Sequence, residues 1–305
     1  MSLATDWITL ASNQLHVEID PHGAQLSVLR SADGSDLLWA GDPTFWTSRA
    51  PILFPIVGAL NGGVYRWRGR NYPLSRHGFA RGRRFDVVDT SATAAGDRNV
   101  VVLRQRDDET TRAVYPFAFE LDISFSLTGA VLTIVATARN TGSDPMPASL
   151  GFHPAFRWPL PGATDRSAHV LEFERDEPWP IRRLDSVGLL TADTHPTPVV
   201  GRCLSLSDDL FVADVMIFDR LVSRSARYRA DVGSSDARSS INVRWPDATH
   251  LGLWTKPGAG FICIELWRGV ADPVGFTGDV DAKPGVEVVP PEGEMALTMI
   301  IEVCA

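Results

Sequence analysis

Apolar and polar residues alternate strictly from Phe119 to Leu127 in this 305-residue chain. Successive side chains of a β-strand point to opposite faces, so this pattern predicts a strand with one buried face. The same alternation recurs in Leu15, Val17 and Ile19, in Leu132, Ile134 and Ala136, and in Ile241, Val243 and Trp245. No run of more than about three turns has helical spacing. The chain is therefore expected to be all-β.

Short turn signals separate these predicted strands and favour antiparallel hairpins over βαβ crossovers. They are Asp33-Gly34, Gly62-Gly63, Gly142-Ser143 and Pro284-Gly285. Many short strands in a chain of this length must bury two sheet faces against each other, which predicts a large antiparallel β-sandwich. No Ser/Gly/Pro-rich linker or long charge run divides the chain, so we expect residues 1–305 to form a single domain.

Charge and cysteine content restrict the class of partner. The formal net charge is −8, which gives no electrostatic basis for binding nucleic acid or an anionic membrane. No apolar run reaches the roughly 18 residues of a membrane span, and no signal peptide pattern begins the chain. Cys203, Cys263 and Cys304 have no CxxC spacing, which argues against a disulfide framework and a structural zinc site. We expect a cytoplasmic protein that binds a small molecule.

Two of the seven histidines lie in segments poorly suited to a hydrophobic core. His77 is followed by glycine and flanked by two arginines, Arg76 and Arg81. His153 precedes Pro154, which ends strand pairing, and aromatic residues surround it. Each histidine taken alone fits a hydrogen-bonded loop position as well as a functional one. Together they favour a functional role.

Glu265 interrupts an otherwise apolar predicted strand, Phe261–Trp267. With a period of two, its side chain shares one face with Cys263 and Trp267. Burial there raises the pKa of a carboxyl toward the range of a general base. An ion pair with Arg268 or Arg81 explains the residue equally well, and the sequence leaves both explanations open.

A histidine and a carboxylate in such positions, together with nine tryptophans, suggest a carbohydrate site. Sugars present hydroxyls for polar contacts and apolar C–H faces for aromatic stacking, so Trp267 is the expected wall beside Glu265. Asp214 is a second acid in an apolar run, with a weaker signal. The other tryptophans considered are expected to pack in the core or in hairpins: Trp39, Trp46, Trp67, Trp158, Trp245 and Trp254.

A series of short segments carries a family resemblance. They are Gly23–Ser27, Leu38–Trp39, Ala50–Gly58, His77–Arg81, Gly151–Phe156, Asp214–Phe218 and Phe261–Trp267. Their order and spacing resemble the aldose 1-epimerase (mutarotase) family, and most closely its bacterial branch with an HGFAR motif, which hexose-6-phosphate 1-epimerases share. The resemblance implies a galactose mutarotase-like supersandwich of antiparallel strands with the sugar cleft on one concave sheet. It also implies a reaction that needs no metal or organic cofactor.

Transferred residue by residue, the resemblance places the general acid on His153 and the general base on Glu265. The acid is then expected to be protonated near the reference pKa of about 6.5. His77 corresponds to a second cleft histidine that holds sugar hydroxyls, and Asp214 to the sugar-binding aspartate. Trp267 is the expected stacking residue.

Two positions depart from the family pattern. Ala59 stands where many members carry a sugar-binding arginine, and Leu266 stands where proline is usual. Loss of that arginine removes charge-assisted donors. Either Arg81 or Arg49 supplies these donors from elsewhere, or specificity has changed, or activity is low.

The expected function is therefore an isomerase that interconverts the α and β anomers of a free aldohexose by acid and base ring opening. A hexose-6-phosphate 1-epimerase is one alternative, supported by Arg49, Arg76 and Arg81 near the expected site. Arg83 and Arg84 are expected to be solvated or paired with nearby acids. A non-catalytic carbohydrate-binding protein of the same fold is the other alternative.

Overall fold

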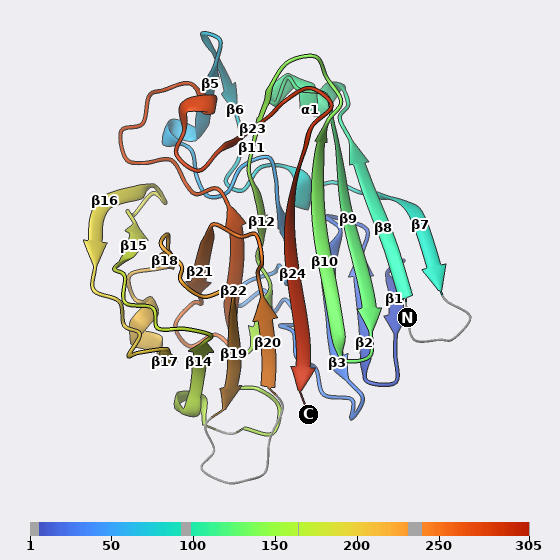
Figure 1. Cartoon of the computed structure of the whole chain (residues 1–305), viewed down its shortest axis with the longest axis vertical. Coiled ribbons are helices and arrows are strands. Elements are labelled where there is room, and N and C mark those ends of the chain that lie inside the picture. The colour runs from blue at the N-terminus through green and yellow to red at the C-terminus, as the bar shows by residue number, and fades with distance from the viewer. Residues whose placement is uncertain (1–5, 93–98, 164, 231–239, 305) are drawn as a thin grey trace.

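The computed structural model describes residues 6–92, 99–163, 165–230 and 240–304, and strands dominate this part of the chain (Figure 1). Its single α-helix among these residues, α1 (Glu109–Val114), is six residues long and is capped by the Asp108 side chain, which accepts from Thr111 N–H. No helix in the described ranges is long and apolar enough to cross a membrane. The expectation of an all-β chain is confirmed.

The larger sheet has nine strands, and every neighbouring pair is antiparallel. In spatial order they are β17 (Cys203–Ser205), β14 (His169–Phe173), β19 (Ser225–Ala230), β20 (Ser240–Arg244), β24 (Glu294–Cys304), β10 (Val131–Asn140), β9 (Phe119–Thr128), β8 (Asn99–Arg106) and β7 (Asp86–Ala92). The alternating residues of β9 are all buried on one face, from Phe119 to Leu127. Sequence periodicity therefore predicted both this strand and its buried side.

The second large sheet has eight strands and carries the candidate site. Its order is β16 (Leu190–His195), β15 (Ile181–Leu184), β18 (Met216–Phe218), β21 (His250–Trp254), β22 (Phe261–Arg268), β12 (Leu150–Phe152) and β4 (Ile52–Leu53), with β13 (Ala155–Arg157) also paired to β22. Three smaller sheets complete the described part of the chain. One has three strands, β1 (Ile8–Ala11), β2 (Leu15–Asp20) and β3 (Gln25–Ser31). The other two are strand pairs, β5 (Val64–Trp67) with β6 (Arg70–Pro73) and β11 (Met146–Ala148) with β23 (Glu287–Val289).

The main core lies between the two large sheets. Phe125 of β9 and Leu297 of β24 share one buried cluster with Ile262 and Ile264 of β22. The other face of β22 turns away from this core, and its residues fall in separate smaller clusters or in the pocket described below. The predicted division of β22 into two faces is thus confirmed.

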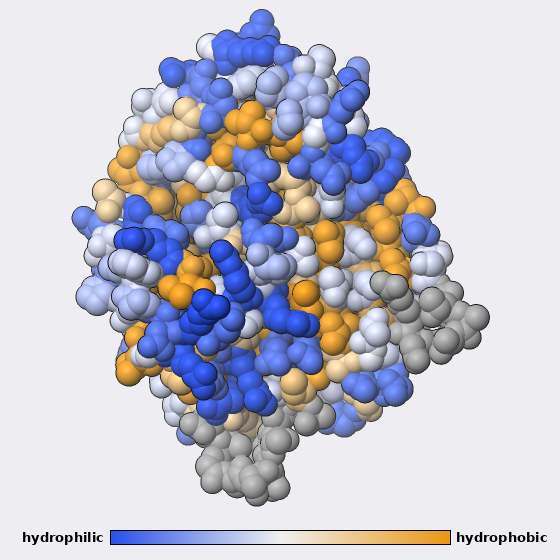
Figure 2. Space-filling model, in the orientation of Figure 1, coloured by the Kyte–Doolittle hydropathy of each residue, from blue (hydrophilic) through white to orange (hydrophobic). Residues whose placement is uncertain are grey.

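Polar residues cover the outer face of the nine-stranded sheet. Along β19 and β20, Arg227 and Arg244 are exposed while Tyr228 and Val243 are buried. Figure 2 shows hydrophilic side chains gathered over the region of β14, β19 and β20. The candidate site described below lies on the second sheet.

Candidate active site

A pocket of about 280 Å³ opens on the face of β22 that turns away from the core. This volume is close to the lower end of the roughly 300–1,000 Å³ typical of small-molecule sites, which suits one sugar ring. Its ionisable lining residues are Arg76, His77, Arg81, His153, Asp214, Lys256 and Glu265. Its aromatic lining residues are Trp46, Trp254 and Trp267. The pocket therefore combines convergent polar groups with aromatic walls.

The strand period aims Glu265 and Trp267 into this pocket from neighbouring positions of one face of β22. Gly252 of β21 lies opposite Glu265 in the register. A Cβ atom at Gly252 would lie 2.5 Å from Cζ2 of Trp267, so the indole occupies the space that a side chain would fill. Because Gly252 has no side chain, the Trp267 indole can lie over this position of β21.

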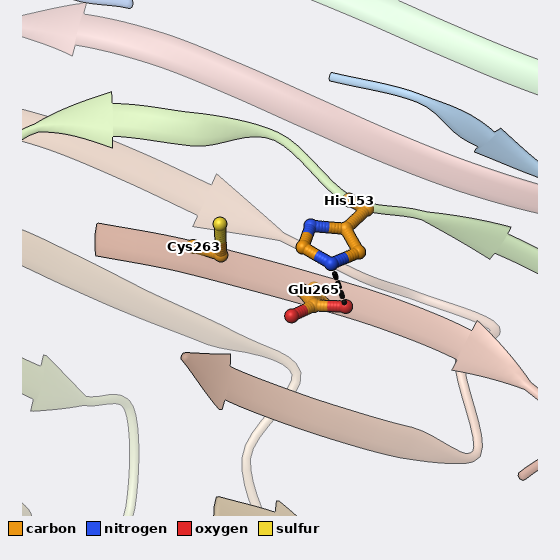
Figure 3. Close-up of side chains that lie close together, drawn as sticks. All are labelled: His153, Cys263 and Glu265. Carbon is orange, nitrogen blue, oxygen red and sulfur yellow. Dashed lines mark ion pairs between the residues drawn. The ribbon is translucent and has the colours of Figure 1, made fainter. Parts of the chain in front are cut away.

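His153 follows β12 and directly precedes Pro154, in the short break between β12 and β13. Its Nε2 lies 3.2 Å from Oε2 of Glu265, and the two side chains are only 10 % and 2 % exposed (Figure 3). Neither arginine considered from the sequence pairs with this carboxylate, because Arg268 binds Glu287 and Arg81 donates to the Arg76 carbonyl. The partner of Glu265 is the imidazole.

Burial disfavours the charged form of both groups in this pair. It raises the pKa of Glu265 well above its ordinary value; the Trp267 indole opposes this in part, and the Asp214 charge adds to it. Burial also lowers the pKa of His153 to about 3, and the positive charge of Arg81 acts in the same direction. The expectation that His153 is protonated near its reference pKa is therefore wrong for this structure, in which burial favours the neutral form of both side chains.

His77 is held by two backbone contacts with Gly58. Its Nδ1 accepts from Gly58 N–H at 3.1 Å, and its own N–H donates to the Gly58 carbonyl at 2.9 Å. Burial lowers the pKa of His77 well below its ordinary value, helped by the charges of His153, Arg81 and Arg76. A neutral ring that accepts at Nδ1 carries its proton on Nε2, so His77 offers one donor. Its ring centroid lies 5.8 Å from that of His153.

Two tryptophans complete the site in a way that the sequence did not predict. The Trp46 ring lies 4.9 Å from the His153 ring and 32° from parallel, and the Trp254 ring lies edge-on at 5.7 Å. Both are half-buried, line the pocket and also pack against a small buried cluster, so the expectation of core or hairpin packing describes only one side of each ring. For Trp158 and Trp245, which are fully buried, it is confirmed. No local pattern distinguishes these two pairs.

Asp214 reaches the pocket from a turn in the left-handed region, with φ of 61°. Arg183 holds this turn, because its guanidinium donates to the carbonyls of Asp214 at 2.6 Å and Leu210 at 2.8 Å. The structure thus brings Asp214 together with His153 and Glu265, although the three lie far apart in the sequence.

The predicted arginines divide into two groups. Arg76 and Arg81 line the pocket, whereas Arg49 is not among the lining residues. The guanidinium of Arg49 instead donates to the Ser27 carbonyl at 2.7 Å and lies 5.0 Å from the Trp7 ring. Arg83 and Arg84 form ion pairs with Asp108 and Asp6, which confirms the expectation that they pair with nearby acids.

Ala59, where the family resemblance implies an arginine, lines the pocket. Its carbonyl accepts from Asp272 N–H at 2.9 Å, so the backbone there is fixed although the side chain offers no donor. Of the two candidates for the missing donors, only Arg81 lines the pocket.

The aldose 1-epimerase family model matches residues 6–237. The chain belongs to the aldose 1-epimerase family. The matched range includes His77 and His153 and ends before Glu265. The protein LacX of Lactococcus lactis is 30% identical in an alignment of 293 residues that covers 93% of this chain and 95% of LacX.

Solved structures of this family have the same fold. A galactose mutarotase-like protein from Lactobacillus casei is 30% identical and superimposes with a TM-score of 0.87 over 98% of this chain and 100% of that one. A galactose mutarotase related enzyme from Lactobacillus acidophilus is 27% identical, with a TM-score of 0.85 over 98% and 97%. The predicted galactose mutarotase-like fold is confirmed, and family membership supports an epimerase activity on a small sugar.

Proposed function

We propose that this chain is an aldose 1-epimerase that interconverts the α and β anomers of an aldohexose by acid and base ring opening. The observation that carries the proposal is the buried His153–Glu265 pair, whose facing atoms lie 3.2 Å apart at the wall of a pocket of sugar size. Simple binding of a sugar does not require two desolvated proton carriers, whereas anomer interconversion requires one proton to be removed and one to be added.

Glu265 and His153 together can supply both proton transfers that the reaction needs. In the neutral pair that burial favours, Glu265 carries the proton, and its transfer to Nε2 of His153, 3.2 Å from Oε2, would give a carboxylate and an imidazolium. The carboxylate then removes the proton of the C1 hydroxyl, the imidazolium protonates the ring oxygen, and the bond between C1 and that oxygen breaks. This step returns the pair to the neutral form that burial favours. Rotation about C1–C2 and the reverse transfers close the other anomer.

Further pocket residues would hold the sugar. Nε1 of Trp267 is a buried donor beside Glu265, so it can donate to a sugar hydroxyl that reaches this carboxyl. His77 offers its Nε2 proton, and the Asp214 carboxylate accepts from hydroxyls. Trp46 and Trp254 provide faces for the apolar side of the ring. These groups orient the sugar and leave the proton transfers to Glu265 and His153.

The first prediction is that catalytic amounts of the chain accelerate the approach of fresh α-glucose and α-galactose to anomeric equilibrium. Polarimetry follows the approach directly, and NMR saturation exchange measures the rate at equilibrium. Heat-denatured chain at the same concentration is the control. A sugar that binds without faster exchange would contradict the proposal and would support the non-catalytic binding protein instead.

A phosphorylated aldose is a second candidate substrate, favoured by the positive side chains of the pocket. Arg76, Arg81 and Lys256 all line it, and within the described ranges none of them forms an ion pair with a carboxylate. Their polar contacts are with the carbonyls of Val187, Arg76 and Phe45, respectively. The neighbouring charge of Arg76 and burial lower the pKa of Arg81. A bound phosphate would relieve that repulsion.

Replacing Arg81 by alanine separates the two candidates. If the substrate is phosphorylated, the KM for glucose 6-phosphate rises about 10–100-fold, since a hydrogen bond to a charged group contributes roughly 1.5–3 kcal/mol. The KM for glucose then changes much less. Arg83→Ala is the matched control, because Arg83 pairs with Asp108 outside the pocket. Equal effects of Arg81→Ala on both sugars would exclude a phosphate contact by Arg81.

A further inference from the structure

We propose that His153, Cys263 and Glu265 together bind a thiophilic divalent cation, Zn²⁺, at the edge of this pocket. His153 and Glu265 line the pocket, and Cys263 belongs to the adjoining buried cluster. A ring nitrogen of His153, Sγ of Cys263 and a carboxylate oxygen of Glu265 all lie within 4.8 Å of one another (Figure 3). The sequence spacing argues only against a structural zinc site made from cysteines. This site is assembled instead from two segments more than 100 residues apart.

The backbone holds these three donors in place. Cys263 and Glu265 are two residues apart on one face of β22, and β21 pairs with both positions. On the other side β13 pairs with Cys263, whereas Glu265 lies opposite the break between β12 and β13 that holds His153. Ala155 of β13 pairs with Cys263, which brings the preceding His153 over the same face. Figure 3 shows the imidazole lying above β22 near both the thiol and the carboxylate. Donors on paired strands need little reorganisation to bind a cation.

The donor set matches the chemistry of zinc. Zn²⁺ binds histidine nitrogen, cysteine sulfur and carboxylate oxygen at about 2.0–2.3 Å, and sites with three protein ligands leave one position open. Tetrahedral bonds of that length separate donors by about 3.5 Å. The observed separations, 3.2 Å between nitrogen and oxygen and at most 4.8 Å overall, require shifts of about an ångström. Mg²⁺ and Ca²⁺ prefer oxygen ligands, so they fit this set poorly.

Charge balance also favours a divalent cation here. The three residues are buried, with whole-residue exposures of 8 %, 0 % and 2 % for His153, Cys263 and Glu265. A thiolate and a carboxylate together neutralise Zn²⁺, so the complex buries no net charge. The cation would occupy the nitrogen and the oxygen that the proposed reaction uses. Zn²⁺ and the sugar are therefore expected to exclude each other, an expectation that rests on the proposed function.

The binding test uses the full chain and does not depend on epimerase activity. Titration with Co²⁺ should produce a thiolate-to-cobalt absorption band with one ion per chain, and Zn²⁺ should displace it. In Cys263→Ala the band should be lost and the affinity for Zn²⁺ should fall at least about 10-fold. Cys203→Ala is the matched control, since Cys203 lies in β17 of the other sheet. Mg²⁺ should leave the band unchanged.

Two results would overturn the site: a cobalt complex without a thiolate band, or wild-type affinity for Zn²⁺ in Cys263→Ala. If Cys263→Ala does not fold, Glu265→Gln provides the second variant and should also weaken Zn²⁺ binding at least about 10-fold. A saturating sugar should slow Co²⁺ loading, and Zn²⁺ should inhibit anomer exchange competitively. Cobalt binding without any epimerase activity would refute only the proposed function, whereas activity without cobalt binding would refute only the cation site.

Discussion

Replacing Glu265 by glutamine is expected to slow anomer interconversion by about 10²–10⁴-fold, the usual contribution of a positioned proton transfer. The amide has nearly the same shape as the carboxyl but cannot take the proton of the C1 hydroxyl. Because Glu265 contacts His153 and no arginine, the substitution breaks no pair with a buried cation. The sugar should therefore still bind, and the loss should fall on kcat. Exchange NMR and binding calorimetry measure the two quantities separately.

Glu287→Gln is the matched control for this variant. Glu287 pairs with Arg268, which also belongs to β22, but it does not line the pocket. It should leave kcat within about twofold of the wild type, as expected for a substitution away from the reacting groups. Retention of more than a tenth of the wild-type rate in Glu265→Gln would show that another group removes the proton.

Replacing Gly78 by alanine is expected to destabilise the fold by about 2–4 kcal/mol. Gly78 has φ of 72°, and a Cβ atom there would lie 2.1 Å from the Phe54 carbonyl oxygen and 2.7 Å from Cδ of Pro55. Both neighbours belong to a segment that cannot move freely, because the Phe54 carbonyl accepts from Phe79 N–H at 3.0 Å. Urea unfolding measures the change as a shift of the midpoint.

Gly129→Ala is the control that separates backbone strain from the clash. Gly129 also has positive φ, 55°, but no atom lies within 4 Å of the position its Cβ would take. Its replacement should cost only about 1–2 kcal/mol, the penalty of the left-handed region. If both variants lose the same free energy of unfolding, the backbone at Phe54 moves away and the predicted clash does not occur. The comparison also tests the placement of His77, because the close contact between Phe54 and Gly78 fixes the residue directly after His77.

Local patterns were sufficient for much of the fold and for part of the site. The strict alternation of β9 predicted its buried face, and the same period placed Glu265 and Trp267 together on the outer face of β22. Glu265 was recognised as a candidate because it is an acid within an otherwise apolar strand, where its carboxyl is removed from water. His153 was marked by its position next to proline and aromatic residues.

Other features could not be predicted because they depend on contacts between distant segments. Trp46 and Trp254 look like other tryptophans in the sequence, and only the packing of the 42–49 segment against β21 and β22 brings them to the pocket. Arg49 and Arg81 are equally plausible donors by spacing. The fold decides between them, because Ser27 and Trp7 engage Arg49 away from the pocket.

The sequence by itself determined the strands and their buried faces and marked His153 and Glu265 as candidate site residues, because side-chain periodicity and local polarity act within a few residues. The tertiary structure alone decided which cations line the pocket, which tryptophans wall it and how strongly burial disfavours the charged forms of His153 and Glu265. Those properties depend on desolvation, which many segments produce together. The 3.2 Å contact of His153 with Glu265 and the neighbouring Cys263 thiol likewise exist only when β12, β13 and β22 pair.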